Sequence, residues 1–452
     1  MVTSIAKKKL KSMVRFTMKK VIVFGAGLVS KPGIRYLLDK GFEVTVASRT
    51  VSKAEAIVDN HPNGKAVAYD ITKDPLDDLI KETDLAISLL PYAFHPDVAK
   101  ACIKYKKHMA TTSYVSDAMK ALDEDAKKAG ILIMNECGVD PGTDHMSAMR
   151  VIHDVQKKGG KITSFKSTTG GLPAPDSNDN PMGYKFSWSP KGVILAGTNA
   201  AQFLDDGKLV EIKSGDLFNH YWPYTVEGMT LEAYPNRDSM LYIDLYGLKG
   251  INTMFRGTFR YPGWCETLQV LFDLDLMNKD AKEGLENLTW KQLMQVILNY
   301  KGDDIGKEIA KKLGKSEDAE CLKRLEWMGL FGDQKIAQGG SHLDALADLF
   351  LTKLGTYKPE ERDMIVMLHE FTAEYPNGKE EKITSTLIDY GIPKGDSSMA
   401  RTVSLPVAIA VRMMLEGEIK ETGIIIPTKP EVYNPILDEL EKLDIVFKEK
   451  VL

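Results

Sequence analysis

Residues 21–30, with the sequence VIVFGAGLVS, decide how the first part of the chain folds. Four apolar residues run directly into a Gly-x-Gly turn, which is typical of a buried strand that feeds a helix. The apolar residues of 34–38 recur at helical spacing, Pro32 lies in the first turn, where its missing N–H costs nothing, and Gly41 ends the helix. A strand, a glycine turn and a helix in this order present backbone N–H groups to a pyrophosphate.

The residues after a second expected strand, 43–47, indicate which dinucleotide binds. Ser48, Arg49 and Thr50 stand where an NAD site usually carries an acidic residue for the ribose 2′-hydroxyl. A guanidinium flanked by two hydroxyls favours a 2′-phosphate, so we expect NADP(H) as the cofactor. Ser30 replaces the third glycine of the usual G-x-G-x-x-G motif. The alternative interpretation of Arg49 is a solvated charge at a strand end.

Length, charge and cysteine content restrict the class of protein. A chain of 452 residues is too long for one ordinary core, which predicts two or three domains. The net charge of −4 gives no general attraction to nucleic acid or to anionic lipid, and no uninterrupted apolar run approaches the length of a membrane span. The four cysteines lie far apart, and the eight histidines show no metal-ligand spacing. We therefore expect no metal site and a reducing cytoplasm.

Alternating strands and helices continue through the first third of the chain. Helical stretches such as 118–129 separate the further expected strands, which lie at 65–71, 85–91, 108–114 and 131–134. This alternation predicts an α/β fold with a Rossmann-like, doubly wound parallel sheet, in which ligands bind beyond the carboxyl ends of the strands.

Beyond residue 145 the pattern changes. Residues 162–168 are expected to form a strand and 170–175 a loop. Helices dominate residues 266–356, where apolar residues return every three or four positions. A Pro-Asn-Gly hairpin signal separates expected strands at 364–368 and 382–387, and residues 406–415 are expected to form an apolar helix.

Arginine is scarce, with 11 arginines against 48 lysines, yet Arg237, Arg256 and Arg260 fall within 24 residues. If residues 255–260 form a strand, its period of two points Arg256, Thr258 and Arg260 to one face. Two or more guanidinium groups on that face suit a substrate with more than one carboxylate. Ordinary salt bridges are the alternative interpretation.

Several side chains near the expected strand ends are candidates for proton transfer: Tyr114, Asp140 and His145, with Lys185 in the later segment GYKFSWS. Asp140 is also suited to capping the loop before Pro141, and His145 to starting a helix. The residue types alone do not rank these candidates.

A set of longer motifs in register identifies a family. They are GAGLVS at 25–30, SRT at 48–50, PYAFH at 91–95, TTSYVS at 111–116, GVDPG at 138–142, GGLPAP at 170–175, GYKFSWS at 183–189 and YPNRDS at 234–239. Together they resemble the saccharopine dehydrogenases of the NADP-dependent, L-glutamate-forming type, also called saccharopine reductases. The resemblance runs from about residue 19 to the C-terminus.

This resemblance implies an oxidoreductase of lysine biosynthesis and lysine degradation. Glutamate and 2-aminoadipate 6-semialdehyde condense to an imine, NADPH gives hydride to the imine carbon, and saccharopine results; the reverse reaction serves lysine breakdown. Saccharopine carries three carboxylates, in agreement with the arginine cluster. Two rivals stay open: a related enzyme that joins another amino acid to an aldehyde, and a non-enzymatic NADP-binding sensor.

The resemblance also implies site residues. The cofactor contacts of the family fall on Leu28, Val29, Ser30, Lys31, Ser48, Arg49, Thr50, Asp70, Ile71, Leu90, Thr112, Ser113, Val139, Asp140, Pro141 and Ser189. Its substrate contacts fall on Ser113, Tyr114, Asp140, Arg237, Thr258, Phe259 and Arg260. As a hypothesis, Asp140 stabilises the iminium and relays a proton, while Tyr114 orients the amine.

The family fold implies a division into domains. We expect a basic N-terminal extension at 1–18, a Rossmann-like NADP-binding domain at 19–144, a mixed α/β substrate domain at 145–265 and 357–400, an all-helical domain at 266–356, and a C-terminal segment at 401–452 that returns to the nucleotide-binding domain. Residues 1–18 are basic without an acidic residue, and a short extension before a start at Met18 is favoured over a transit peptide.

As partners we expect the small-molecule substrates, no nucleic acid and no membrane, with a homodimer kept as an alternative to a monomer. No lysine-2-oxoglutarate reductase domain is fused to the sequence, so we expect the free-standing form of the enzyme.

Overall fold

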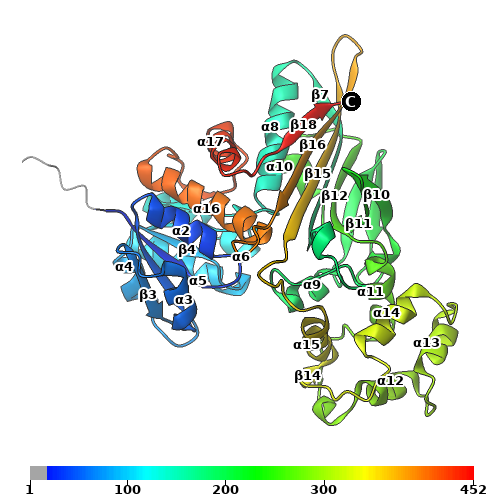
Figure 1. The fold of residues 1–452 in the computed structure, drawn as a ribbon. Helices are drawn as coiled ribbons and strands as arrows, with labels where there is room; N and C mark the ends of the chain where they lie inside the picture. Colours follow the sequence, from blue (N-terminus) through cyan, green and yellow to red (C-terminus); the bar gives the residue numbers. More distant parts are fainter. Residues whose placement is uncertain (1–17) are drawn as a thin grey trace, which may run out of the picture. The chain divides into compact units, whose positions relative to one another are not determined.

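Figure 1 shows the protein as a computed structural model, which describes residues 18–452. The expected basic extension at 1–18 therefore lies outside the described residues, apart from Met18. The chain forms two compact units. Of the described residues, the first unit contains 18–135 together with Val407–Ile425, and the second contains Glu136–Pro406 and Ile426–Leu452.

The sheet of the first unit is entirely parallel, with the strand order β17-β6-β5-β4-β1-β2-β3. Its strands are β1 (Lys20–Phe24), β2 (Glu43–Ser48), β3 (Gly64–Ala68), β4 (Leu85–Ser88), β5 (His108–Thr111), β6 (Leu132–Met134) and β17 (Gly423–Ile425). The order of the first six strands is the doubly wound dinucleotide-binding order, so the expected fold class is confirmed. The run 21–24 is buried at the centre of this sheet because both sheet faces of a doubly wound fold are covered.

Helices separate the strands of the first unit: α2 (Lys31–Asp39), α3 (Val51–Val58), α4 (Asp77–Lys81), α5 (His95–Tyr105), α6 (Asp117–Lys120) and α7 (Asp123–Ala129). The single helix expected at 118–129 is thus two. The Asp123 carboxylate accepts the Ile424 N–H at 2.7 Å and pairs with Lys127 at 2.7 Å, which holds the first turn of α7 against β17. The strands expected to reach 71 and 114 end at Ala68 and Thr111, so their last residues are free to form loops.

The second unit is built on a nine-stranded mixed sheet. Seven strands follow the order β10-β11-β12-β7-β15-β16-β18, and β8 pairs with β12 and β9. The strands are β7 (Lys161–Pro173), β8 (Ala201–Asp205), β9 (Lys208–Ile212), β10 (Trp222–Val226), β11 (Met229–Pro235), β12 (Thr253–Arg260), β15 (Asp363–Glu374), β16 (Glu380–Tyr390) and β18 (Lys448–Val451). The long helix α8 (Thr143–Lys157) packs on β7, β15 and β16.

The expected loop at 170–175 is wrong for residues 170–173, because β7 continues to Pro173. This strand lies between β12 and β15; its pairing with β12 ends at Thr169, and its pairing with β15 continues to Pro173. A Cβ on Gly170 would lie 2.7 Å from the Cβ of Phe259, and one on Gly171 would lie 2.5 Å from the terminal methyl of Met399. These glycines therefore indicate close packing in a strand, which composition alone does not separate from a turn.

The other helices of the second unit include α9 (Pro190–Ala196), α10 (Leu241–Leu245), α11 (Trp264–Asp273), α12 (Trp290–Leu298), α13 (Ile305–Leu313), α14 (Glu320–Met328), α15 (His342–Leu354) and α17 (Pro430–Glu441). Helices α12 to α15 gather at one end of the unit, where the small pair β13 (Ala281–Lys282) and β14 (Gly340–Ser341) also lies (Figure 1). Whether they form a separate all-helical domain stays a prediction.

The compact units differ from the expected boundaries in two places. The first unit ends at Asn135 rather than at 144, because the loop before α8 packs within the second unit. Of the C-terminal segment expected to return to the nucleotide-binding part, only Val407–Ile425 does so. The last residues instead belong to the second unit, where β18 pairs with β16 as an edge strand.

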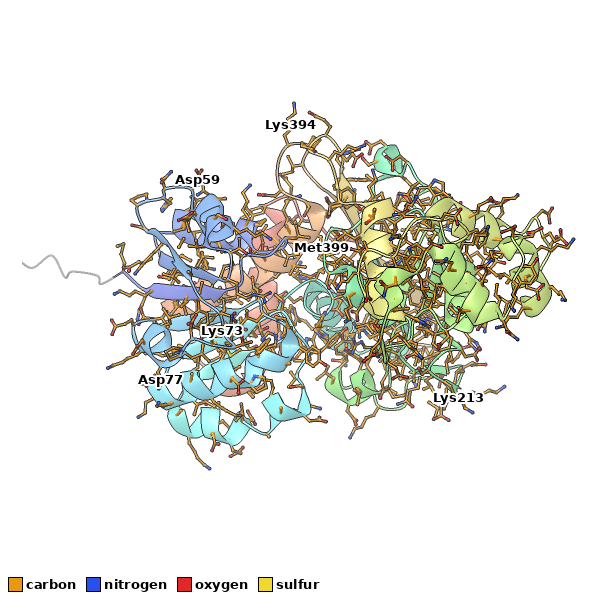
Figure 2. All side chains as sticks on the ribbon, turned by 90° about the horizontal axis from the view of Figure 1, so that it is seen from below. Asp59, Lys73, Asp77, Lys213, Lys394 and Met399 are labelled. Carbon is orange, nitrogen blue, oxygen red and sulfur yellow. The ribbon has the colours of Figure 1, made fainter. Side chains whose placement is uncertain are left out.

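Helix α16 (Ser398–Glu416) is long and apolar enough to cross a membrane by length and composition, with a mean hydropathy of 1.3. In the protein 72% of that stretch is buried, as expected for a core helix. The helix expected at 406–415 is thus its second half. Charged side chains extend outward from both units, as Figure 2 shows for Asp59, Lys213 and Lys394.

Candidate active site

The glycine turn after β1 is shaped to receive a phosphate. Gly25 has a φ of +114°, and a Cβ there would lie 3.1 Å from the carbonyl oxygen of Leu89, so this position favours glycine. No atom lies within 4 Å of a Cβ built on Gly27, which leaves open space beside the turn. Ser30 is buried as the N-cap of α2, and its Oγ donates to the Gly27 carbonyl at 2.9 Å. The turn fits a pyrophosphate with Ser30 in place of the third glycine.

Arg49 follows the carboxyl end of β2, and its side chain is exposed. Within residues 18–452 it forms no ion pair at 4.0 Å or less. Asp70, after β3, accepts the N–H of Thr72 at 3.0 Å and its Oγ1 hydroxyl at 2.7 Å. These hydrogen bonds, and then the charges of Lys73 and Arg49, lower the pKa of Asp70. Lys73, labelled in Figure 2, pairs with Asp70 at 3.6 Å, and the predicted role of Arg49 at a 2′-phosphate stays a prediction.

The other predicted contacts in the first unit lie at the same edge of its sheet. Leu28, Val29 and Lys31 belong to the turn and the start of α2, and the remaining ones follow β3, β4 and β5: Ile71, Leu90, Thr112, Ser113 and Tyr114. Because all these strands are parallel, their carboxyl ends share one edge. The structure therefore brings together the first-unit residues that were predicted to contact the cofactor.

His95 is a buried residue of this edge that the sequence interpretation did not assign to the site. Its Nδ1 lies 2.8 Å from the Ser88 Oγ, and its Nε2 lies 2.8 Å from the Ser113 Oγ and 3.3 Å from the Thr111 Oγ1. Burial lowers the pKa of His95 to about 4, so the imidazole is neutral at physiological pH. His95 therefore holds the predicted contact Ser113 in place without adding charge. Its position after β4, within PYAFH, was the only available signal.

In the second unit, Asp140 lies in a tight loop between two glycines. The Gly138 N–H donates to the Pro141 carbonyl at 2.9 Å, and the Thr143 N–H donates to the Gly138 carbonyl at 2.9 Å. Gly142 has a φ of +150°, and a Cβ there would lie 2.0 Å from the Gly138 oxygen, which no side chain could avoid. The loop therefore presents the Asp140 carboxylate, whose side chain is 14% exposed, on a closely fixed backbone.

The expected strand at 255–260 is confirmed as part of β12, but Arg256 does not belong to a free cationic face. Its Nη2 donates to Asp140 Oδ1 at 2.5 Å and to Asp144 Oδ2 at 2.8 Å. Its Nη1 donates to the Tyr242 hydroxyl at 2.7 Å, and its guanidinium carbon lies 4.2 Å from the centre of that ring. For Arg256 the salt-bridge alternative is therefore correct, and both partners are carboxylates of its own unit.

Arg260, four residues along the same strand, has very different surroundings. Its guanidinium carbon lies 5.1 Å from the ring centre of Tyr184 and 5.3 Å from that of Trp264. Nη1 donates to the Phe259 carbonyl at 2.8 Å, while the buried Nε has no hydrogen-bond partner. Glu232 of β11 lies directly opposite Arg260, but its carboxylate accepts the N–H groups of Gly263 and Cys265 at the N-terminus of α11. Within residues 18–452, no carboxylate lies within 4.0 Å of Arg260.

In the described residues, the sheet face that carries Arg260 also holds another buried polar atom without a hydrogen-bond partner. Thr169 of β7 is in register with Thr258 of β12, so both side chains lie on the face that carries Arg260, and the Thr169 Oγ1 is unsatisfied. Phe259 points to the opposite face, where it packs with Leu172, Met364 and Val366. If Phe259 contacts substrate as predicted, it does so through its main chain.

The remaining predicted residues of the second unit are placed as follows. Val139 and Pro141 flank Asp140 in the loop. Arg237 is exposed after β11 with a φ of +58°, and the Gln202 N–H donates to its carbonyl at 3.0 Å. Ser189 is the exposed N-cap of α9 and accepts the Gly192 N–H at 3.3 Å. These positions leave their predicted roles as predictions.

Two proton-transfer candidates are occupied by ion pairs. Lys185 is buried between Glu361, at 2.8 Å, and Asp179, at 3.0 Å. Burial lowers its pKa, but the hydrogen bonds to these carboxylates outweigh burial and raise it overall, so Lys185 is a structural cation rather than a base. His145 lies in the first turn of α8, fully buried, with its Nε2 2.8 Å from Glu136 Oε2.

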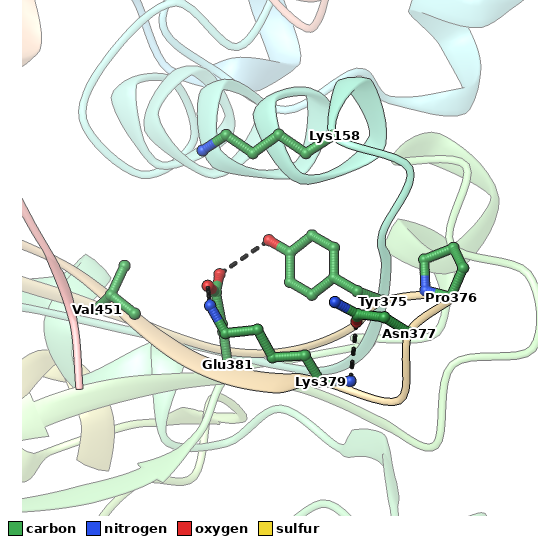
Figure 3. Close-up of a pocket in the computed structure, with 7 residues that line it drawn as sticks. All are labelled: Lys158, Tyr375, Pro376, Asn377, Lys379, Glu381 and Val451. Atoms are coloured by element: carbon green, nitrogen blue, oxygen red, sulfur yellow. Dashed lines mark hydrogen bonds and ion pairs between the residues drawn. The ribbon is translucent and has the colours of Figure 1, made fainter.

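A surface hollow formed by residues near Tyr375 is unrelated to these groups (Figure 3). Two of its charged side chains pair with each other, since Lys379 lies 2.6 Å from Glu381, which also accepts the Tyr375 hydroxyl at 2.9 Å. The third, Lys158, pairs with Asp154 at 2.6 Å. The hollow lies beside the start of β7, since Glu374 pairs with Lys161, whereas Thr169 and Arg260 lie further along the sheet. In the described part of the chain, no group of three or more His, Cys, Asp or Glu side chains is placed to hold a metal ion.

Comparison with known proteins identifies the family behind this arrangement. Residues 21–134 match the saccharopine dehydrogenase NADP binding domain, and residues 138–445 match the saccharopine dehydrogenase C-terminal domain. The chain belongs to the saccharopine dehydrogenase family. Its first unit is the NADP-binding part of that family, so the expectation of NADP(H) as the cofactor is confirmed, while the role of the glycine turn stays a prediction.

Members of the saccharopine dehydrogenase family from fungi align over the whole length. The saccharopine dehydrogenase (NADP(+), L-glutamate-forming) of Schizosaccharomyces pombe is 41% identical, with 96% of this chain and 99% of that protein covered. A solved structure of the apo, histidine-tagged saccharopine dehydrogenase (L-Glu forming) of Saccharomyces cerevisiae has a TM-score of 0.88 at 41% identity, covering 96% of this chain and all of that chain.

The family also contains longer proteins. The mitochondrial alpha-aminoadipic semialdehyde synthase of Bos taurus is 41% identical over 95% of this chain, but this chain spans only 48% of that protein. The family resemblance drawn from the motifs is therefore confirmed by similarity over the whole aligned length, not only at the glycine turn.

Proposed function

We propose that this protein is an NADP-dependent oxidoreductase of lysine metabolism that interconverts saccharopine with L-glutamate and 2-aminoadipate 6-semialdehyde. The observation that carries the proposal is the buried Arg260 guanidinium, which has no carboxylate partner among residues 18–452. Burying an unpaired charge costs roughly several kcal/mol of folding free energy, and a ligand of opposite charge offsets that cost. A substrate carboxylate supplies that partner, and saccharopine has three.

The surroundings of Arg260 favour such a ligand over water. The rings of Tyr184 and Trp264 are buried and lie 4.9 Å apart, so they cover the guanidinium with apolar surface. In such surroundings a charge-assisted hydrogen bond between guanidinium and carboxylate is stronger than at an exposed site. The unpartnered hydroxyl of Thr169 on the same face supplies a second polar group.

The cofactor site fits NADP(H) by the chemistry of its own residues. The turn at Gly25 and Gly27 accommodates the pyrophosphate, and exposed Arg49, between two hydroxyl residues, binds the 2′-phosphate. When bound, NADP⁺ accepts the hydride that leaves the carbon next to the secondary amine. His95 holds the Ser113 hydroxyl at the neighbouring strand end.

Asp140 and Tyr114 are the proposed catalytic residues. In the oxidative direction the protonated secondary amine of saccharopine loses one proton, the adjacent carbon loses hydride, and the nitrogen lone pair forms the C=N bond of a positively charged iminium. Water then adds to this bond, and the C–N bond of the resulting carbinolamine breaks to give the amino group of glutamate and the aldehyde. Asp140 as a carboxylate stabilises the positive iminium and accepts the proton released on water attack, while Tyr114 orients the amine.

The test is reduction of NADP⁺ on addition of saccharopine, followed by NADPH absorbance, with NAD⁺ in parallel. We expect reduction with NADP⁺ and little with NAD⁺. Reduction only with NAD⁺ would overturn the role of Arg49, and no reduction with either would overturn the reaction. In that case a panel of other amino acids with aldehydes distinguishes a different condensing enzyme from an NADP-binding sensor.

Asp140→Asn tests the proposed catalytic carboxylate. We expect turnover to fall by about 100- to 1,000-fold, because electrostatic stabilisation of the developing charge is lost. NADPH affinity, measured by fluorescence, is expected to stay close to that of the wild type. Turnover equal to the wild type would remove Asp140 from the mechanism.

The location and assembly belong to the same proposal. The four cysteines are buried and unpaired, which suits the reducing cytoplasm. The partners are small molecules, and a homodimer is to be distinguished from a monomer by light scattering.

A further inference from the structure

The Asp140 carboxylate is one end of a chain of alternating charges in the second unit. Asp140 and Asp144 share the guanidinium of Arg256, at 2.5 and 2.8 Å. Asp144 lies 3.9 Å from the His145 Nε2, which in turn lies 2.8 Å from Glu136. With His145 protonated, the signs alternate along the whole series. Four of the five side chains are at least 90% buried, and only Asp140, at 14% exposed, reaches further towards solvent.

We propose that Arg256 is a positioning residue that, held by Asp144 and by the His145–Glu136 pair, fixes the Asp140 carboxylate in its reactive orientation. This inference rests on the proposed function, in which Asp140 acts on the substrate. Arg256 itself lies behind Asp140 and is 2% exposed, so it acts through that carboxylate rather than on the substrate.

The guanidinium is fixed from several sides. Its Nη1 donates to the Tyr242 hydroxyl, and the Tyr242 ring lies beneath it. The Arg256 main-chain N–H donates to the Ser239 Oγ at 2.9 Å. Asp144 contributes with both oxygens, since Oδ2 accepts from Arg256 and Oδ1 accepts the Gly142 N–H at 2.6 Å. Asp144 therefore links the guanidinium directly to the loop that carries Asp140.

The far end of the series is fixed in the same way. The Tyr246 hydroxyl lies 2.7 Å from the His145 Nδ1, and the Tyr242 ring stacks on the imidazole at 5.7 Å. Burial lowers the pKa of His145, but the charges of Asp144 and Glu136 and the hydrogen bond to Glu136 outweigh it and raise the pKa above its usual range. His369, the other histidine facing this cluster, is neutral because burial lowers its pKa to about 3, and its Nε2 lies 2.7 Å from the Ser147 Oγ.

The network carries three carboxylates and two cations, and its ion pairs hold the Asp140 carboxylate in one position. A carboxylate that rotated away from Arg256 would be free to take other rotamers, and a displacement of about 1 Å at a reacting group can cost about 100-fold in rate. The planar guanidinium bridges two carboxylates at once, whereas a lysine ammonium in its place is a point charge without that fork.

The experiment is a double-mutant cycle on kcat for saccharopine oxidation, using the full chain. The variants are Arg256→Met, Asp140→Asn and the double variant, with Arg256→Lys as a second, milder change. If Arg256 acts through Asp140, Arg256→Met lowers kcat by about 100-fold in the wild-type background and by less than about 3-fold in the Asp140→Asn background. Arg256→Lys is expected to recover part of the loss, with KM for NADP⁺ unchanged.

A matched control comes from Arg401, which forms a buried ion pair with Asp389 at 2.8 Å and donates to the Leu443 carbonyl at 2.7 Å. Arg401→Met removes a comparable buried arginine that has no contact with Asp140, so kcat is expected to stay within about 3-fold of the wild type although the melting temperature falls. Arg256→Met and Arg401→Met thus separate a loss of stability from a loss of positioning.

Three results would overturn the inference. One is an equal loss of kcat from Arg256→Met in both backgrounds, which marks an effect independent of Asp140. Another is a pair of results seen together. A wild-type kcat in Arg256→Lys would show that the planar guanidinium is not needed, and a soluble but inactive Arg401→Met would show that loss of an unrelated buried arginine also abolishes turnover. The third is wild-type turnover in Asp140→Asn. That result would show that the reaction does not need the Asp140 carboxylate, so Arg256 would have no reactive group to position, although saccharopine oxidation itself would still be observed. Failure of the reaction is seen separately, as absence of NADP⁺ reduction by the wild type.

Discussion

Arg256 and Arg260 lie four residues apart on β12 and point to the same face, yet their surroundings differ in kind. Arg256 meets two carboxylates, a tyrosine hydroxyl and an aromatic ring within its own unit. Arg260 contacts two aromatic rings and one main-chain carbonyl, and its Nε has no hydrogen-bond partner among the residues that the structure describes. Both side chains are buried, so burial does not distinguish them.

The difference teaches how to tell a structural cation from a binding cation. A buried arginine with its carboxylates already in place has its desolvation cost offset by the fold. A buried arginine without them carries that cost until a ligand arrives, and is expected to favour an anion strongly when it does. The same substitution should therefore have different effects at the two positions: at Arg256 it should mainly lower the free energy of unfolding, and at Arg260 it should mainly lower kcat/KM for the substrate.

The largest expected effect is on stability. Arg256→Met leaves Asp140 and Asp144 without their cation, and breaking a buried pair on one side costs about 3–5 kcal/mol in the free energy of unfolding. Denaturation by urea, monitored by tryptophan fluorescence, measures this loss. A stability equal to that of the wild type would show that the two arginines do not differ in the way described.

Arg260→Met is expected to act on the substrate instead. Loss of a buried, charge-assisted contact costs about 2–4 kcal/mol, roughly a 30- to 1,000-fold fall in kcat/KM for saccharopine. The free energy of unfolding should not fall, because the substitution removes an unpaired buried charge. The comparison would be contradicted if Arg260→Met lowered the free energy of unfolding as much as Arg256→Met does and left kcat/KM unchanged.

Arg49 extends the comparison to an exposed arginine that forms no ion pair in the described part of the chain. Arg49→Ser removes charge-assisted hydrogen bonds worth about 1.5–3 kcal/mol to the 2′-phosphate. The dissociation constant for NADPH should rise by about 10- to 100-fold while that for NADH changes little. Fluorescence titration with both nucleotides measures this, and an equal effect on both would show that Arg49 does not read the 2′-phosphate.

The smallest and most specific effect concerns pH. Because the folded pKa of His145 is raised above its unfolded value of about 6.5, its contribution to stability is fully present below that pH and is lost as pH rises through the folded value. The stability difference between wild type and His145→Gln should therefore narrow as the pH rises. The free energy of unfolding of Arg260→Met should depend on pH in the same way as that of the wild type. A difference that widens at high pH would contradict the sign given for His145.

Much of the first unit was predictable because its signals are local. The run 21–24, the Gly25 and Gly27 turn and Arg49 each follow from neighbouring residues, since strand, turn and helix are set by short-range geometry. The errors were also local in origin: Gly170 and Gly171 resemble a turn in sequence, but pairing with β15 keeps them in β7, where they pack closely against Phe259 and Met399.

The site in the second unit was only partly predictable. Alternation along β12 correctly placed Arg256, Thr258 and Arg260 on one face, and the family motifs drew attention to Asp140. Neither signal showed that Asp140 pairs with Arg256, that Asp144 and His145 complete a charged series, or that His95 supports Ser113. Those partners lie up to 116 residues apart in the sequence, and no short-range rule joins them.

The sequence by itself determined the doubly wound nucleotide unit, the preference for NADP(H) and the family, because these depend on motifs whose geometry is contained in a few consecutive residues. The tertiary structure alone decided which arginine is neutralised and which is free for a ligand. The physical reason is that the charge state of a site depends on what packs within about 4 Å of it, and that is set by the pairing of β12 with its neighbours and by the loop before α8.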